Sequence, residues 1–296
     1  MEARHVFVKG RFGFGVFYRA EDFIVYITIV SALVREMSLT VLAFCPMFNH
    51  IHFLFKDIEP RKMRSFIQRM AIIFVKEYNK EYDRRGTLFQ KPFGCSVKRA
   101  VKIIMGSVAY VFNNPVAGKL CGTAKEYRWN LLAYLESANP FSKPLRKEKA
   151  RNQMRAALKK VDYFHSVGKP LSYAALRDIF KCLDKEEQAR MTDYILTKYN
   201  FLSAEWLETL YGSYGKMITA IDSNAGSEFD IEDEYGDHSC YRSMLRLVMK
   251  SGYKGRELNF EKLDEEEARC LFRRIMTATK ASPACVNKFL HIENNQ

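Results

Sequence analysis

Two histidines, His50 and His52, stand one residue apart in an otherwise apolar segment. In a β-strand, side chains two residues apart point to the same face, so the two imidazoles would lie side by side. Ile51, Phe53 and Phe55 would then face the other way, toward a core. Because imidazole is a common metal ligand, the pair predicts a site for one divalent metal ion. Two same-face histidines with no metal are the alternative.

A second group of polar side chains lies near the end of a predicted helix over residues 101–113. Val101, Ile104, Val108 and Val111 form its apolar stripe at helical spacing. Tyr110 lies off this stripe, and Asn114 follows one turn later on the same face. A tyrosine off the core face can also be a plain surface or interface residue.

The elements that must position these side chains alternate in type. Residues 5–8, 16–18, 39–44 and 50–56 predict strands, and 21–36, 61–82 and 101–113 predict helices, the last one stopped by Pro115. Residues 88–94 predict a loop or an edge strand. Since there is no regular βαβ rhythm, the fold class we expect is α+β, an antiparallel sheet with helices packed on it.

The second half of the chain predicts helices alone. Residues 139–150 contain two prolines and four basic residues and predict a basic linker, followed by a helical C-terminal domain over 151–296. Asp184 and Asp264, each followed three residues later by Glu, predict helix N-termini. A helix over 264–277, then Ser282-Pro283 starting another, predicts a helix-turn-helix DNA reader near 264–291. A plain helical hairpin has the same pattern.

The charge distribution indicates a polyanionic partner. The 296 residues include 47 Lys and Arg and 34 Asp and Glu, for a net charge of +13. Residues 1–150 carry 25 basic and 12 acidic side chains, so the whole excess lies there. Such asymmetry favours nucleic acid as the partner, although basicity can serve solubility alone.

Composition excludes several classes of protein. Hydrophobic residues make up 48% of the chain, which is too many for wholesale disorder. No apolar run is long enough for a transmembrane helix, and the seven cysteines form no CxxC pair. We therefore expect no membrane partner, no disulfide framework or zinc knuckle, and a cytoplasmic location.

Candidate DNA contacts are basic and aromatic. Phosphates could be bound by Lys62, Arg64, Arg69, Lys91, Lys98, Arg99 and Lys102. Unpaired bases could stack on Phe89, Phe93 and Trp129. The alternatives are solvated surface charges for the former and core packing for the latter.

Motifs over residues 5–130 also follow a recognisable order. After the first strand come Glu21-Asp22-Phe23, Met47-Phe48-Asn49-His50-Ile51-His52 and Gly86-Thr87-Leu88-Phe89-Gln90-Lys91-Pro92-Phe93, then Tyr110-Val111-Phe112-Asn113-Asn114-Pro115-Val116 and Tyr127-Arg128-Trp129. In this order and spacing the chain resembles the single-tyrosine HUH transposases, U being a bulky apolar residue, and especially the REP-associated tyrosine transposases. Phe48 replaces the usual Pro, and Asn130 replaces a Ser that often follows the Trp.

This resemblance implies a fold and a chemistry. Residues 1–138 would form an HUH transposase domain, ferredoxin-like or RRM-like. His50 and His52 would hold Mg²⁺ or Mn²⁺, with Asn114 as the third ligand, and Tyr110 would be the nucleophile. The enzyme would nick and rejoin single-stranded DNA at hairpin-flanked sites through a 5′-phosphotyrosine intermediate, and it would act as a homodimer.

Three other functions are compatible with the same residues. A domesticated DNA-binding regulator would keep the fold and lose mobility, and a REP-type housekeeping nuclease would cleave DNA without moving itself. An unrelated metal hydrolase would use His50 and His52 without Tyr110.

Overall fold

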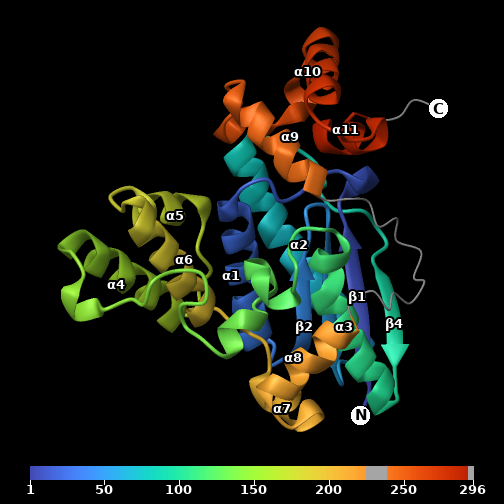
Figure 1. The fold of residues 1–296 in the computed structure, drawn as a ribbon, viewed down its shortest axis with the longest axis vertical. Coiled ribbons are helices and arrows are strands. Elements are labelled where there is room, and N and C mark those ends of the chain that lie inside the picture. Colours follow the sequence, from blue (N-terminus) through green and yellow to red (C-terminus); the bar gives the residue numbers. More distant parts are fainter. Residues whose placement is uncertain (225–238, 293–296) are drawn as a thin grey trace.

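A four-stranded antiparallel sheet forms the centre of the protein (Figure 1). The computed structural model describes residues 1–224 and 239–292. The strand order is β2-β3-β1-β4. The strands are β1 (Ala3–Lys9), β2 (Thr40–Pro46), β3 (His50–Lys56) and β4 (Gly94–Lys98). Helix α1 (Ala20–Glu36) connects β1 to β2, and α2 (Pro60–Tyr82) connects β3 to β4. The chain is therefore α+β, as predicted.

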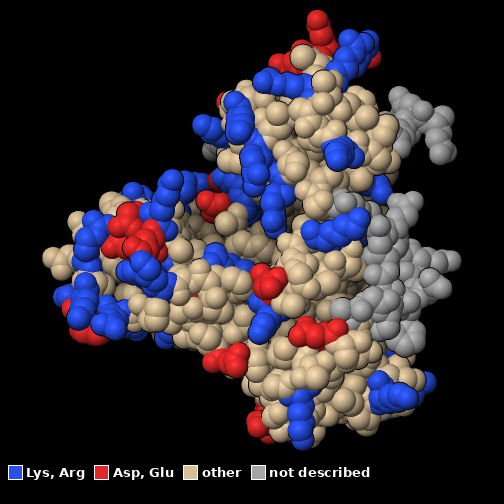
Figure 2. Space-filling model, in the orientation of Figure 1, with Lys and Arg blue, Asp and Glu red and all other residues tan. Residues whose placement is uncertain are grey.

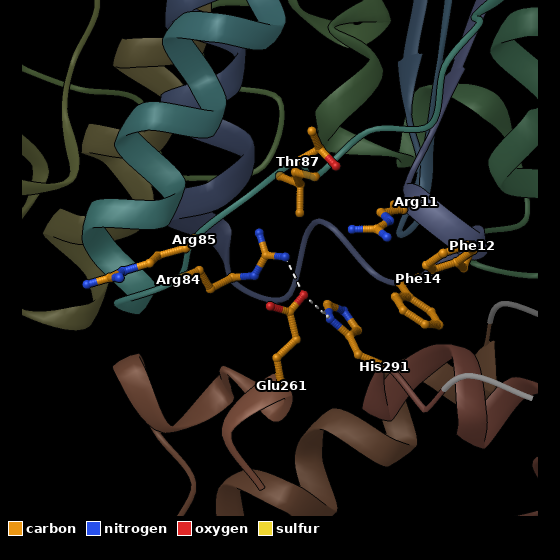
Figure 3. A pocket seen from close by; sticks show the side chains of 9 residues that line it. Arg11, Phe12, Phe14, Arg84, Arg85, Thr87, Glu261 and His291 are labelled. Carbon is orange, nitrogen blue, oxygen red and sulfur yellow. Dashed lines mark hydrogen bonds and ion pairs between the residues drawn. The ribbon is translucent and has the colours of Figure 1, made fainter.

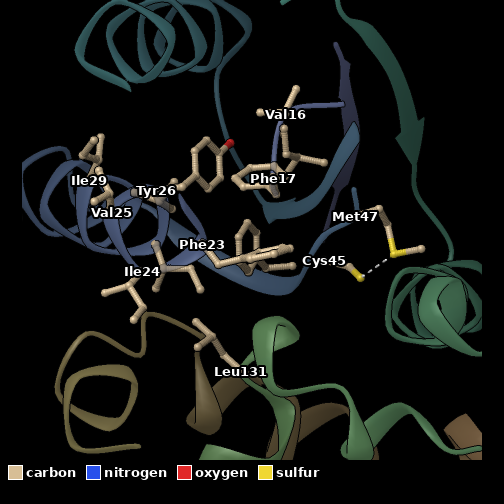
Figure 4. Packing of buried hydrophobic residues seen from close by; sticks show 14 of the residues in the cluster. Val16, Phe17, Phe23, Ile24, Val25, Tyr26, Ile29, Cys45, Met47 and Leu131 are labelled. Carbon is tan, nitrogen blue, oxygen red and sulfur yellow. Dashed lines mark hydrogen bonds between the residues drawn. The ribbon is translucent and has the colours of Figure 1, made fainter. Parts of the chain in front are cut away.

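The two faces of the sheet carry different residues and are covered by different helices. Phe53 of β3 faces α2, where it packs edge-to-face on Phe66. On the same face, Phe44 of β2 stacks with Tyr26 of α1. Figure 4 shows the α1 side chains of this core. Helix α3 (Val101–Ala117) covers the opposite face, on which the histidines lie.

A buried carboxylate joins α1 to two other helices. Asp22 is fully buried and accepts hydrogen bonds from the hydroxyls of Tyr82 in α2 and Tyr173 in α5 (Tyr173–Phe180), each at 2.8 Å. The backbone N–H groups of Tyr18 and Arg19 donate to its other oxygen. Burial raises the pKa of Asp22, and Arg19 with these hydrogen bonds opposes the rise.

The helices of the second half pack around the sheet unit in three groups (Figure 1). Beside α1 lie α4 (Asn152–Ser166), α5 (Tyr173–Phe180) and α6 (Lys185–Lys198). Against α3 lie α7 (Ala204–Tyr211) and α8 (Tyr214–Ser223). Beyond the end of β1 lie α9 (Ser239–Lys250), α10 (Glu265–Ala278) and α11 (Pro283–Leu290). Asn113 of α3 donates to the carbonyl of Ile221 in α8. The hydroxyl of Tyr18 donates to the carbonyl of Phe289 in α11. These helices therefore do not pack only among themselves.

The segment predicted as a basic linker, 139–150, is docked on α6. The backbone N–H of Phe141 donates to Asp193, which is fully buried. Lys143 forms an ion pair with Glu186. Both contacts join this segment to α6, so it is packed against the helical part of the chain.

The predicted strands and helices are found, with three differences. Residues 16–18 form no strand, because the N–H groups of Val16 and Phe17 both donate to the carbonyl of Phe48 instead of a strand ladder. Strand β4 begins at Gly94, where the predicted loop ends. Helix α3 continues through Pro115 instead of stopping there.

The predicted N-termini in the second half are confirmed. Asp184 and Asp264 each accept from the backbone of the glutamate three residues later, which completes a capping box. Ser282 caps α11, and Val286, Phe289 and Leu290 are buried. A DNA-reading role for the α10–α11 pair stays a prediction. Within 1–224 and 239–292, no helix combines the length and apolar character needed to cross a membrane.

We expect Asp22→Ala to lower the free energy of unfolding by about 3 kcal/mol, because two buried tyrosine hydroxyls lose their acceptor. Urea unfolding followed by circular dichroism measures this. Glu21→Ala, a half-buried carboxylate one residue earlier, is the matched control and should change stability far less. Equal losses for both variants would contradict the role of Asp22.

Candidate active site

The central strands place three histidines on the sheet face under α3. In the pairing of β1 with β3, Phe7 lies opposite His52 and Lys9 lies opposite His50. Directly opposite residues share a face, so His5, two residues before Phe7, is on this face too. The ring centroids of His50 and His52 are 4.9 Å apart, with the rings at 89°.

His52 is the most enclosed group of the site. It is 1% exposed, and its Nδ1 lies 3.0 Å from Nε2 of His5. Its Nε2 is buried without a hydrogen-bond partner among the described residues. Burial, followed by the charges of His50, His5 and Lys9, lowers the pKa of His52 well below its usual value, while Asn114 opposes this. This environment therefore favours the neutral ring.

His50 is oriented by the residue before it in the chain. Its Nδ1 lies 2.8 Å from Oδ1 of Asn49, and Nδ2 of Asn49 donates to the carbonyl of Gly13 at 3.0 Å. Since an amide oxygen only accepts, the proton of His50 resides on Nδ1, and Nε2 carries the lone pair. This is the tautomer that a metal-ligating histidine needs.

Tyr110 of α3 stands over the two buried histidines. Its ring centroid lies 5.5 Å from that of His5 and 5.8 Å from that of His52, edge-on in both cases. The phenol also lines a cavity of about 540 Å³. Gly106 and Ser107, one turn earlier, line the same cavity. The phenol and the imidazoles therefore come together within one chain.

Asn114 compensates for the proline that follows it. Pro115 has no N–H to donate to the carbonyl of Val111. Nδ2 of Asn114 instead lies 3.4 Å from that carbonyl and 2.9 Å from the carbonyl of Tyr110. Its amide nitrogen thus faces the helix backbone, and Asn114 raises the pKa of His52 against the effect of burial.

The remaining donors at this face are few. Among residues 1–224 and 239–292, no three His, Cys, Asp or Glu side chains gather into a cluster able to hold a metal ion. His50, His52 and the amide of Asn114 are the groups that could do so. Nε2 of His5 contacts Nδ1 of His52, so His5 would orient the His52 ring instead of binding the metal itself.

The predicted phosphate contacts fall in two places. Lys98 and Lys102 line the Tyr110 cavity, and Arg99 lies between them in sequence, exposed and paired with Glu2. The others lie elsewhere: Lys62, Arg64 and Arg69 on α2, across the sheet, and Lys91 in the exposed loop before β4. Arg69 pairs with Glu36 of α1. Figure 2 shows Lys and Arg side chains gathered over α2 and beside α9.

The aromatic candidates are engaged in packing. Trp129 stacks on Phe23 of α1 at 4.5 Å and 8°. Phe89 is buried and stacks with Phe74, and Phe93 packs against the core. A DNA contact by the half-buried Trp129 stays a prediction.

Sequence reasoning missed two residues of this site, His5 and Asn49. His5 lies 45 positions before His50, and only the β1–β3 register brings it beside His52. Asn49 precedes His50 directly, but no local pattern distinguishes an amide bonded to the ring from an ordinary turn residue.

We expect the ring of His52 to stay neutral when the pH is lowered through about 6.5, where an ordinary histidine gains a proton. The reason is that burial and the neighbouring cations disfavour the imidazolium. Proton NMR, with the signal assigned by comparison with His52→Gln, measures this. A titration midpoint near 6.5 would contradict the enclosed geometry.

Comparisons with known proteins returned one remote likeness. No protein-family profile and no curated protein matches the chain. Among solved structures, part of the chain is similar to a REP-associated tyrosine transposase bound to a REP hairpin, with 13% identity over 42% of this chain and 73% of that one. The TM-score is 0.33, so the likeness is distant.

Proposed function

We propose that this protein is a metal-dependent enzyme that nicks and rejoins single-stranded DNA, with Tyr110 as its nucleophile. The observation that carries the proposal is the position of the Tyr110 ring, 5.5 and 5.8 Å from the rings of His5 and His52, in a cavity with two lysines. A phenol, metal-competent imidazoles and cations at one place suit the transfer of a phosphodiester.

The donor set fits a divalent cation. Nε2 of His52 is a buried atom that has no hydrogen-bond partner in the described part of the chain, a costly arrangement that a bound cation would relieve. His50 offers its own Nε2, and the amide oxygen of Asn114 would complete the set for Mg²⁺ or Mn²⁺. When bound, the ion supplies Lewis-acid polarisation of the scissile phosphate. Asn49 holds the His50 imidazole in its tautomer, and His5 contacts Nδ1 of the His52 imidazole.

The covalent step exchanges one phosphate ester for another. The Tyr110 oxygen forms a bond to phosphorus while the bond from phosphorus to the 3′ oxygen breaks. The proton lost by the phenol is balanced by the one gained at the 3′-OH. Because the 5′-phosphotyrosine retains the ester, the 3′-OH can attack it and rejoin the strand with no added energy source.

The substrate is held by cations at the cavity and by the chain around it. Lys98 and Lys102 would neutralise phosphates on either side of the scissile bond.

The β-α-β-β-α-β order of the first half supports a ferredoxin-like, HUH-type unit. The resemblance adds hairpin-flanked DNA and a homodimer; since Tyr110 and the histidines meet within one chain, the proposed step itself needs no second copy.

We expect Tyr110→Phe to abolish the covalent protein–DNA adduct while leaving DNA affinity unchanged, because only the attacking oxygen is lost. Labelled hairpin-flanked oligonucleotides with Mg²⁺ and a denaturing gel detect the adduct. Tyr211→Phe removes another phenol from the same cavity, one that donates to the carbonyl of Met105, and should retain the adduct. An adduct that persists in Tyr110→Phe would reject the nucleophile.

Chelation of divalent metal should also abolish the adduct, and Mg²⁺ or Mn²⁺ should restore it. We expect Asn49→Ala to raise the metal concentration needed for half-maximal adduct formation by about tenfold, because His50 loses the group that orients it. His165→Ala, a histidine of α4, is the control and should leave this concentration unchanged. Full activity of the wild-type protein in chelator would overturn the metal assignment. Absence of the adduct under every condition would instead favour a DNA-binding regulator.

A further inference from the structure

A second pocket lies beyond the end of β1, where three distant parts of the chain meet (Figure 3). Its volume is about 150 Å³. Arg11, Phe12 and Phe14 come from the loop after β1, Arg84 and Thr87 from the segment after α2, and Glu261 and His291 from the C-terminal helices. Neither the candidate active site nor its chemistry uses this pocket.

Arginine side chains line the pocket and offer N–H donors. The guanidinium of Arg84 is 5% exposed and forms an ion pair with Glu261, yet its Nε is buried without a hydrogen-bond partner among the described residues. Arg11 adds a second guanidinium, which Figure 3 shows turned toward the pocket. With Arg85, three arginines and one carboxylate line the pocket, and the net positive charge suits an anionic ligand.

Phe12 provides an aromatic surface beside this charge. Its ring is 51% exposed, and the guanidinium carbon of Arg11 lies 4.6 Å from the ring centre. Its φ of +56° lies in the left-handed region, which is costly for a bulky residue. A ring left half in solvent recovers little of this cost through burial. Strain of this kind is typical of residues kept for a ligand.

The loop that carries Phe12 is tied directly to the active site. Lys9, at the end of β1, pairs with His50, and the N–H of Gly10 donates to the carbonyl of Asn49. The side chain of Asn49 then bonds His50 with one end and the carbonyl of Gly13 with the other. The loop that carries Arg11 and Phe12 therefore begins beside His50.

We propose that this pocket binds a second part of the single-stranded DNA substrate, outside the nucleotides that react. One base stacks on Phe12, and a phosphate lies between the guanidinium groups of Arg11 and Arg84. Both contacts are independent of base identity, so the pocket would hold the strand in place along β1 rather than select a sequence. The identity of the strand rests on the proposed function; the pocket chemistry does not.

The test is binding of labelled oligothymidine to the full chain in chelator, where no cleavage occurs. We expect Phe12→Ala to weaken binding about tenfold, because a stacked base is lost, and Phe12→Trp to retain it. Arg11→Ala should reduce the slope of log affinity against log salt by about 0.7, the value for one phosphate contact on a single strand. The controls, Tyr163→Ala and Lys159→Ala, remove an exposed aromatic and an exposed cation from α4 and should change neither quantity.

The outcomes separate the pocket from the chemistry. Phe12→Ala and Arg11→Ala binding like the two controls, with unchanged thermal unfolding, would overturn the pocket, as would a wild-type protein that binds no single strand. Loss of affinity in both variants supports the pocket even if wild-type protein forms no adduct, and that result would reject the proposed function alone. An adduct formed at wild-type rate by variants with unaltered affinity would reject the pocket alone.

Discussion

The pleat of β3 is the constraint on which the rest of the structure depends. This one strand supplies Phe53 to the core under α1 and α2 and His52 to the opposite face under α3. A register shift of one residue would move the imidazoles into the core and the phenylalanines onto the site. The pairings with β1 and β2 on both sides of β3 prevent this, so the packing of the core and the geometry of the site are decided together.

Around that strand, polar groups position one another in short chains of hydrogen bonds. His5 holds His52, and Asn49 holds His50. Asn49 continues to Gly13 and thus to the loop that carries Phe12. The same loop region meets the C-terminal helices, because the hydroxyl of Tyr18 donates to Phe289 and contacts His291. The second half of the chain therefore packs against the segment that follows β1.

Local rules failed where a tertiary or side-chain partner replaced a backbone partner. Pro115 is a helix breaker by rule, yet α3 continues through it because the amide of Asn114 bonds the carbonyls nearby. Val16 and Phe17 have strand-forming side chains, but both N–H groups bond a single carbonyl of Phe48. In each case the hydrogen-bond partner that decides the backbone conformation is not part of the propensity rule behind the prediction.

The sequence by itself determined the α+β class, nearly all strands and helices, and the shared face of His50 and His52, because alternation and helical periodicity are local properties of the chain. It also identified Tyr110, Lys98 and Lys102 as candidates for the site. Only the tertiary structure decided that Tyr110 stands over His5 and His52, that Lys62, Arg64 and Arg69 lie across the sheet, and that Arg11 and Arg84 share a pocket with Glu261. These outcomes depend on which strands pair and which helix covers which face of the sheet. Such long-range contacts cannot be predicted from the residue at any single position.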